Sequence, residues 1–190
     1  MIILVACSAT KLDHRAEARD LYQGEVFKLV RRIAEHPASR VQDWAILSAQ
    51  HGLVAPTDTI DPYDLYLGDL TSDERAAWHR RVLDQIIATW GSSPVYQVYA
   101  GSHYTNLLWN RTLPHCERVY ATWAADHRES KARTHFGLGH IRSRLLKQLA
   151  ALDDALAFMP EPSLDSVPTA PELDPKTHRF RAQLAWLFES

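Results

Sequence analysis

The chain has 190 residues, of which 46% are hydrophobic and 23% charged, and its formal net charge at pH 7 is −2. These values are typical of one soluble globular domain, and the near-neutral charge gives no support to strong non-specific nucleic-acid binding. No apolar run approaches the ~20 residues that span a bilayer, and no signal peptide is visible, so we expect a cytoplasmic protein that does not bind membranes.

The cysteine and histidine content argues against a metal site. The only two cysteines, Cys7 and Cys116, stand far apart in the chain. No Cys-x-x-Cys or His-x-x-x-His pair is present, although the chain has ten histidines. We therefore expect reduced thiols, no structural zinc and no tightly bound cofactor.

The N-terminal half predicts two buried strands and two helices. Residues 2–6 are apolar throughout, as in a central strand covered on both faces. The polar segment 7–24 is long enough to be functional or to carry a short helix of its own. A helical pattern follows from Gly24 to His36, and a second apolar strand ends in the turn His51-Gly52. Thr71-Ser72-Asp73-Glu74 is a strong helix start, and Gly91 closes that helix.

The C-terminal half continues the alternation of strands and helices. It predicts a third strand at 95–99, a helix that opens at Ser102, a fourth strand at 118–122 and a helix after Phe136-Gly137-Leu138-Gly139. This pattern predicts one three-layer α/β domain over residues 1–158, with a mainly parallel central sheet flanked by helices. Residues 159–177 are rich in proline and predict a linker or strap. Residues 178–190 predict a helix that docks on the domain or on a second subunit, which would allow a homodimer.

Polar residues follow three of the predicted strands at the point where each strand ends. Parallel strands place these ends at one edge of the sheet, where open α/β sheets bind ligands. The first end carries a thiol, hydroxyls and an ammonium that could activate a nucleophile or hold an anion, namely Cys7, Ser8, Thr10 and Lys11. Cys7 is a candidate nucleophile or, alternatively, a small buried filler. The motif lacks the glycines of a Walker A loop.

The second strand end centres on His51. A strand-end imidazole could act as a general acid or base near neutral pH, with Ser48 in the same network. Gly52 permits a positive backbone dihedral or the close approach of a ligand. Downstream, Asp61 could orient the imidazole and Tyr63 could stack on a ring. A histidine that only satisfies loop carbonyls is the alternative.

The third strand end is a candidate anion site. Gly101, Ser102 and Tyr104 stand where a helix is expected to open, and free amides at a helix start favour phosphate or carboxylate. Ser102 could instead be a simple cap of that helix. A basic group could contact a nucleic-acid backbone, although a solvated face explains it as well: Arg128, Lys131, Arg133, Arg142, Arg144 and Lys147.

The order of these motifs resembles a known family. Cys-Ser-x-x-Lys after the first strand, Leu-Ser-Ala-x-His-Gly-Leu-Val, Asp-Pro-Tyr and Phe-Gly-Leu-Gly are similar to elements of bacterial and phage domains related to the YaaA peroxide-stress proteins. The Cys-Ser-x-x-Lys element also resembles one in archaeosine synthase, which acts on a deazaguanine nitrile. The chain departs from YaaA proteins where His51 replaces their tyrosine, and it lacks their additional DNA-binding insertion. The resemblance implies an α/β domain linked to nucleic acids, modified bases or oxidative stress.

Three functions are therefore expected at this stage. The first is an enzyme without a metal that acts on a nucleobase, nucleotide or deazapurine-like compound, with Cys7, Lys11 and His51 as catalytic residues. In that hypothesis the substrate contacts are Ser8, Thr10, Ser48, Gly52, Asp61, Tyr63, Gly101, Ser102 and Tyr104. The second is a DNA-binding stress protein of the YaaA type. The third is a sensor domain for a nucleotide-like ligand.

Overall fold

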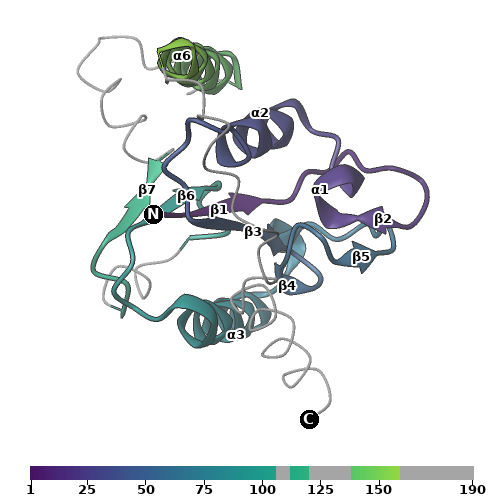
Figure 1. Ribbon diagram of the computed structural model, residues 1–190. Coiled ribbons are helices and arrows are strands. Elements are labelled where there is room, and N and C mark those ends of the chain that lie inside the picture. The colour runs from purple at the N-terminus through teal and green to yellow at the C-terminus, as the bar shows by residue number, and fades with distance from the viewer. Residues whose placement is uncertain (106–111, 120–137, 159–190) are drawn as a thin grey trace, which may run out of the picture.

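A five-stranded sheet forms the middle layer of the computed structural model, which describes residues 1–105, 112–119 and 138–158 (Figure 1). Its strand order is β4-β3-β1-β6-β7. The central strand β1 (Ile2–Ala6) pairs in parallel with β3 (Asp43–Ser48) on one side and with β6 (Tyr96–Tyr99) on the other. Strands β3, β1 and β6 therefore point the same way, as does the next strand in the order, and their carboxyl ends share one edge. The predicted α/β class with a mainly parallel sheet is confirmed.

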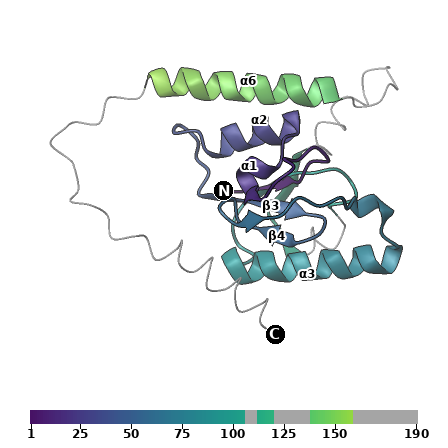
Figure 2. The ribbon, with the colours of Figure 1, turned by 90° about the vertical axis from the view of Figure 1, so that its right-hand side faces the viewer.

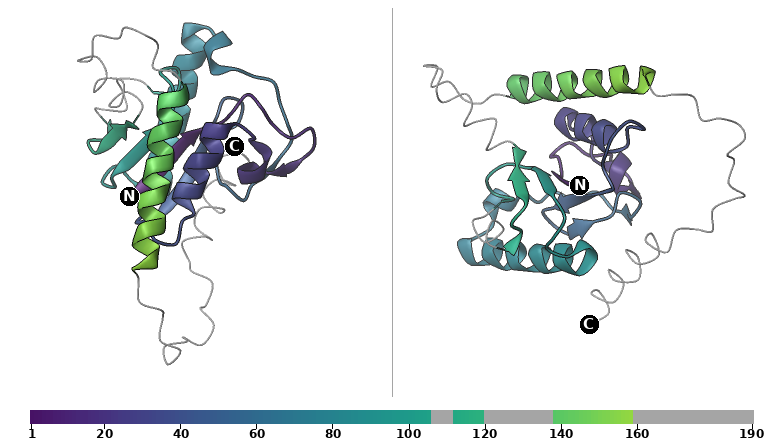
Figure 3. Two further views of the ribbon diagram at one scale, coloured as in Figure 1. Left: turned by 90° about the horizontal axis from the view of Figure 1, so that it is seen from above. Right: turned by 60° about the vertical axis from the view of Figure 1, so that its left-hand side comes forward.

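Helices cover both faces of this sheet (Figure 2). On one face lie α2 (Glu25–Ala34) and α6 (Leu138–Ala157), which pack against each other along their length (Figure 3). On the other face lies α3 (Ser72–Trp90). The alternation of β-strand side chains divides the core in two, with Ile3 and Val5 facing α2 and α6, and Ile2 and Leu4 on the side of α3.

The ends of α3 follow the predicted chemistry. The Thr71 side chain accepts a hydrogen bond from the Glu74 amide, and the Glu74 carboxylate accepts one from the Thr71 amide, which together form a capping box. Gly91 ends the helix with a φ of 80°. The same agreement holds for α2, which begins after Gly24 as the sequence predicts.

The turn after β3 belongs to a hairpin that the sequence does not predict. β4 (Gly52–Val54) returns antiparallel to β3, with Ser48 opposite Gly52. Residues 49–51 are thus the loop of a tight hairpin at the sheet edge, and Gly52 has a φ of 80° at its end. Three residues are too few to be seen as a separate strand by periodicity alone. The predicted end of a strand at this position is confirmed, whereas the return strand β4 was not predicted.

Two further predictions in the C-terminal half fall partly on residues outside the described part. Residues 102–104 form a turn, closed by the Tyr104 amide on the Gly101 carbonyl at 3.0 Å, and the helix expected to open here would continue through residues 106–111. Residues 106–111 lie outside the described part. β7 (Cys116–Arg118) pairs in parallel with β6 and meets the expected fourth strand at Arg118, while residues 120–122 of that expected strand lie outside the described part. The predicted strap and C-terminal helix, residues 159–190, also lie outside the described residues.

A small second sheet joins two loops that are distant in sequence. β2 (Ala16–Glu17) pairs antiparallel with β5 (Thr59–Ile60), so the loop after β1 lies beside the loop after β4. The short helix α1 (Ala18–Leu21) follows β2, and a 3₁₀ turn (Leu67–Asp69) precedes α3. The long segment after β1 was expected to be functional or to carry a short helix. The second of these expectations is confirmed.

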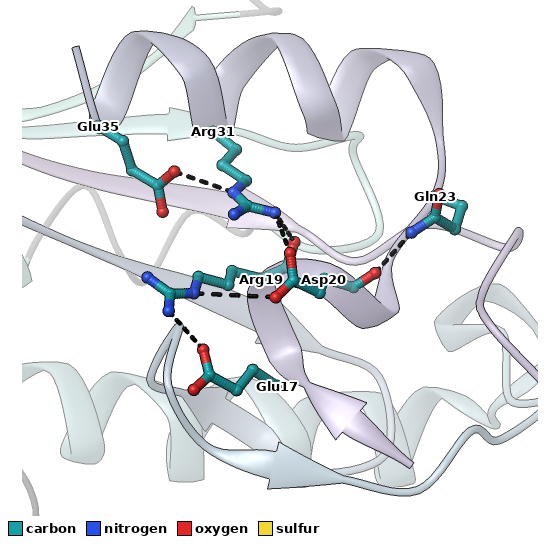
Figure 4. Close-up of polar contacts among 6 residues, drawn as sticks. All are labelled: Glu17, Arg19, Asp20, Gln23, Arg31 and Glu35. Carbon is teal, nitrogen blue, oxygen red and sulfur yellow. Dashed lines mark hydrogen bonds and ion pairs between the residues drawn. The ribbon is translucent and has the colours of Figure 1, made fainter. Parts of the chain in front are cut away.

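Ion pairs fix α1 against α2 (Figure 4). Arg31 of α2 donates to the Asp20 carboxylate at 2.6 Å, to the Arg19 carbonyl at 2.8 Å and to Glu35 at 2.9 Å. Arg19 in turn contacts Glu17 at 2.6 Å. Since Arg31 is partly buried, these contacts hold the loop that carries Lys11 more firmly than an exposed pair would.

Candidate functional site

The candidate site lies at the carboxyl edge of β1 and β3, where the sequence predicts it. Cys7 is the first residue after β1, and its amide donates to the Leu47 carbonyl of β3 at 3.0 Å. Ser48 is the last residue of β3 and is fully buried. The turn that carries Tyr104 follows β6, on the other side of β1. Register and strand order thus bring three separate parts of the sequence to one place.

The Cys7 thiol contacts a buried phenol. Its Sγ lies 3.3 Å from the Tyr104 hydroxyl oxygen. Burial, with the neighbouring Cys7 as the second cause, raises the pKa of Tyr104 well above its usual value. The phenol therefore keeps its proton and can donate it in a hydrogen bond to sulfur. The Tyr104 ring is held by the Trp78 ring, with centroids 5.7 Å apart, and Trp78 donates to the Ser48 carbonyl at 3.0 Å.

Tyr63 connects the hydroxyl groups of the site. Its oxygen lies 2.7 Å from Ser48 Oγ and 3.1 Å from the Tyr22 hydroxyl. Ser48 Oγ also accepts a hydrogen bond from the His51 amide at 3.0 Å, which fixes the hairpin loop. Burial raises the pKa of Tyr63 strongly and that of Tyr22 to about 12, so both phenols are neutral over the physiological range. Three buried hydroxyls thus form one continuous network.

His51 stands at the border of this network. Its ring meets the Tyr63 ring edge-on, with centroids 5.3 Å apart. Its Nε2 atom is buried and has no hydrogen-bond partner among the residues that the structure describes. Burial, and secondarily Arg81, lower the pKa of His51, while Asp61 opposes them. The imidazole is therefore neutral near pH 7 and can accept a proton.

Lys11 supplies the positive charge of the site. Its ammonium lies 4.4 Å from the centroid of the Tyr63 ring and 5.9 Å from that of Tyr22, which are cation–π distances. A β-bridge between Lys11 and Tyr22 fixes the backbone here. The ammonium also donates a long hydrogen bond to the Ala9 carbonyl at 3.4 Å. Because Lys11 covers the Tyr63 ring, a base can stack there only after this side chain moves.

Ser8 and Thr10 have partners within their own loop. Ser8 Oγ donates to the Thr10 carbonyl at 2.6 Å and accepts from the Gly24 amide at 3.0 Å. A Cβ at Gly24 would come within 2.6 Å of Ser8 Cβ, so only glycine lets α2 start this close. The Ser8 hydroxyl thus holds the loop to α2, and the exposed Thr10 side chain lies beside it.

The other predicted substrate contacts lie at the rim of the site. Asp61, Gly101 and Ser102 are exposed. Asp61 acts on His51 through charge, as expected for an orienting carboxylate, although no hydrogen bond joins them. Gly52 is buried, and a Cβ there would lie 2.8 Å from Gln85 Oε1, which accepts from the Leu53 amide at 3.0 Å. Close packing against α3 therefore accounts for Gly52 without a ligand.

Only part of the predicted basic group falls within the described residues. Arg128, Lys131 and Arg133 lie outside the described residues. Arg142 on α6 forms an ion pair with Glu25 of α2, and Arg144 is partly buried on the same helix. Within the described ranges no group of three or more potential metal ligands occurs, and no helix there has the length and hydrophobicity of a membrane span.

Sequence reasoning missed three residues of the site. Tyr22 and Trp78 hold Tyr63, Ser48 and Tyr104 from outside the strand-end motifs. Arg81 of α3 influences His51 through its charge. Tyr22 stands directly before Gln23-Gly24, at the turn that ends the long loop. An aromatic residue next to this turn is the sequence signal that could have identified Tyr22 as part of the site.

The fold and the site define an α/β domain with a thiol, tyrosine and histidine cluster at the carboxyl edge of a parallel sheet. A family model described as a family of unknown function (DUF6884) matches residues 2–128, which is more than half of the chain. The chain belongs to this family. The matched range contains every residue of the cluster and ends before α6. No curated protein and no solved structure matches the chain.

Proposed function

We propose that the chain is an enzyme that acts on a nucleobase, nucleotide or deazapurine-like compound, with Cys7 as nucleophile. The contact between Cys7 Sγ and the Tyr104 hydroxyl carries this proposal. The protonated phenol can donate a hydrogen bond to the sulfur, which holds the Cys7 side chain in position for attack on a substrate carbon. The resemblance of the Cys-Ser-x-x-Lys and His-Gly-Leu-Val motifs to domains linked with modified bases supports the class of substrate.

The proposed step is an addition to an electrophilic carbon of the base, such as that of a C=N or nitrile group. The thiolate forms a C–S bond, and one C–N π pair moves to nitrogen. That nitrogen takes the proton that the thiol has lost, so the step needs no oxidant or reductant. A protonated Lys11 stabilises the negative charge as it develops, and the neutral His51 carries the proton.

The unpartnered Nε2 of His51 supports its role in proton transfer. A buried polar atom without a partner destabilises the protein, and such atoms often mark functional sites. A donor on the substrate, or a movement of the hairpin loop, would give this nitrogen its partner. The Ser48–Tyr63–Tyr22 hydroxyls then keep the loop in position while the proton moves.

The test combines a ligand screen with single-residue variants. Thermal shift over nucleosides, nucleotides, 7-deazapurines and their nitriles identifies compounds for turnover assays. Cys7→Ser and His51→Ala should each lower turnover ~10²-fold or more, while ligand binding persists. Cys116→Ser is the matched control, since Cys116 lies on β7 outside the site, and it should keep full activity. Full turnover in a folded Cys7→Ser protein would refute the nucleophile.

A ligand that binds without turnover would instead indicate the sensor function. Mass spectrometry of the protein after incubation with an electrophilic hit provides a second readout. The proposal predicts an adduct on Cys7 and none on Cys116. The pKa of the Cys116 thiol is raised to about 11 by burial, so this cysteine is a poor nucleophile at neutral pH.

A further inference from the structure

A surface cleft next to the thiol cluster has the composition of an anion site. It lies between the first half of α3 and the turn after β6, with a volume of about 280 Å³. Its lining comprises Ser72, Arg75, Ala76, His79, Ser102, His103 and Thr105. Among the described residues, one guanidinium, two imidazoles and three hydroxyls line the cleft, and no carboxylate does. Such a donor set suits an oxyanion rather than a cation.

Contacts between α3 and the turn hold the walls of this cleft in place. His79 is 5% exposed and forms a hydrogen bond with the His103 backbone. The His79 ring packs edge-on against Trp78, with centroids 5.2 Å apart, and Trp78 contacts Tyr104. On the outer side, the His103 ring lies 5.7 Å from the Tyr66 ring. The two walls are thus fixed relative to each other and to the residue that contacts Cys7.

Arg75 has donors to spare for a ligand. Its Nη1 donates to the carbonyls of Leu70 at 3.3 Å and Gly68 at 3.5 Å, which holds the side chain against the 3₁₀ turn. No carboxylate forms an ion pair with Arg75 in the described part of the chain. Glu74, its neighbour in α3, hydrogen-bonds to Thr71 instead. The positive charge of Arg75 is therefore not neutralised by any carboxylate of the described residues.

The size and place of the cleft indicate which part of a ligand it takes. Pockets that enclose a whole drug-sized ligand measure roughly 300–1,000 Å³, so this open cleft accommodates a terminal group rather than an entire nucleotide. Ser102 lines the cleft, and Tyr104, two residues further on, contacts the Cys7 thiol. A ligand with its phosphate in the cleft can therefore extend over this turn toward the strand ends.

We infer that the cleft formed by Arg75, His79, Ser102 and His103 binds the phosphate group of a nucleotide-like ligand. This inference deepens the proposed function, because it names a phosphorylated compound as substrate. It also shifts the anion contact away from Lys11 and Ser8, since the Ser8 hydroxyl already has two partners in the loop. Arg75 is the main charged contact, and the hydroxyl and imidazole groups complete the site.

The first experiment titrates the full chain with inorganic phosphate and follows backbone amide shifts by NMR at constant ionic strength, with chloride as the competing anion. Saturable shifts are expected around Arg75, Ala76, Ser102 and His103. Arg75→Gln should weaken phosphate binding at least tenfold. The matched control is Arg80→Gln on the same helix, which removes the same charge at an exposed position outside the cleft, and it should change the Kd less than twofold.

A second variant keeps the inference testable if Arg75→Gln fails to fold. His103→Gln changes an exposed side chain of the cleft and should weaken phosphate binding about threefold, in proportion to one lost polar contact. Equal weakening by Arg75→Gln and Arg80→Gln would overturn the inference, because it would show a response to overall charge only. Shifts confined to the Lys11 and His51 loops, or no saturable shifts, would overturn it as well.

The second experiment separates this inference from the proposed function. The affinity of guanosine 5′-monophosphate is compared with that of guanosine in the wild type and in Arg75→Gln. The phosphate should increase affinity at least tenfold in the wild type and little in the variant. Phosphate binding in the cleft without any Cys7-dependent turnover would support the phosphate site and refute the proposed enzyme function. Cys7-dependent turnover of an unphosphorylated base, without binding in the cleft, would do the reverse.

Discussion

At the scale of single residues, Tyr63 joins the two loops of the site through its hydroxyl group. Tyr63→Phe removes the hydrogen bonds to Ser48 and Tyr22 and leaves two buried hydroxyls short of a partner. We expect the free energy of unfolding to fall by about 1–3 kcal/mol in urea denaturation. Tyr66→Phe is the control, because Tyr66 is 52% exposed, and it should change stability by less than about 0.5 kcal/mol. Equal losses of stability in Tyr63→Phe and Tyr66→Phe would show that the hydroxyl network does not stabilise the fold more than an exposed tyrosine hydroxyl does.

The lowered pKa of His51 predicts how stability depends on pH. The folded protein binds the proton less tightly than the unfolded chain, whose histidine pKa is about 6.5. Between these two pKa values the unfolded state holds more protons, so stability falls as the pH is lowered through this window. Urea midpoints should therefore drop from about pH 7.5 to about pH 5.5, and His51→Gln should reduce the drop.

Two controls make this pH prediction specific. The pKa of His79 is also lowered by burial, so the His51 variant should keep part of the pH dependence. His115→Gln, which changes an exposed histidine outside the site, is the matched control for the loss of one imidazole. NMR titration of the His51 ring provides a direct check, and a midpoint at or above 6.5 would contradict the prediction.

Some of these residues could be predicted from the sequence and others could not. Cys7 and Ser48 stand directly after apolar runs, and His51 follows Ser48 in the same turn, so their position at the sheet edge follows from the local pattern. The partners of these residues do not follow from it. Tyr104 reaches Cys7 across 97 positions and Tyr22 reaches Tyr63 across 41, and such contacts depend on strand order and loop packing. The cleft around Arg75 was missed for the same reason.

At the scale of secondary-structure elements, the β3–β4 hairpin explains the position of His51. The hairpin reverses over residues 49–51, and its return strand packs on α3 through Gly52. Gly52→Ala places a Cβ at a φ of 80° and 2.8 Å from Gln85 Oε1, which must then move from the Leu53 amide. We expect a loss of about 1–3 kcal/mol in the free energy of unfolding.

Gly139→Ala provides the comparison for this variant. Gly139 lies near the start of α6, where a Cβ meets open space, and alanine favours helix over glycine by up to about 1 kcal/mol. The two glycine-to-alanine changes should therefore have opposite signs in urea denaturation. If Gly52→Ala were neutral, the hairpin would tolerate a side chain at this position, and the close packing on Gln85 would not explain the glycine.

Elements differ in how well the sequence predicts them. Helices α2 and α3 were found because their start signals and apolar spacing are local. The two-residue strands β2 and β5 carry no periodic pattern, yet they hold the loop after β1 beside the loop after β4. Gly101–Tyr104 form a turn closed by one backbone hydrogen bond, and the helix expected to follow it falls on residues 106–111, outside the described part. Short elements depend on tertiary contacts, and their sequences are too short to show a hydrophobic period.

At the scale of the whole molecule, the family match and the folded layers do not coincide. The match ends at residue 128, whereas α6 spans Leu138–Ala157 and covers the same sheet face as α2 (Figure 2). Ile141, Leu145 and Leu149 of α6 are buried in one cluster with the core residues of α2. Without α6 this side of the α2 layer would lose its cover, so the chain needs a segment beyond the matched range to complete its core.

Two neighbouring leucines of α6 test this dependence. Leu145 is fully buried against α2, whereas Leu146 is 36% exposed on the other side of the same helix. Leu145→Ala should lower the free energy of unfolding by about 2–5 kcal/mol, as expected for a buried leucine that leaves a cavity. Leu146→Ala should lower it by less than about 1 kcal/mol. Since α6 packs on the sheet face opposite α3, Leu145→Ala should leave the phosphate affinity of the Arg75 cleft unchanged while the protein stays folded. Similar small losses for both variants would mean that α6 is not part of the cooperative core.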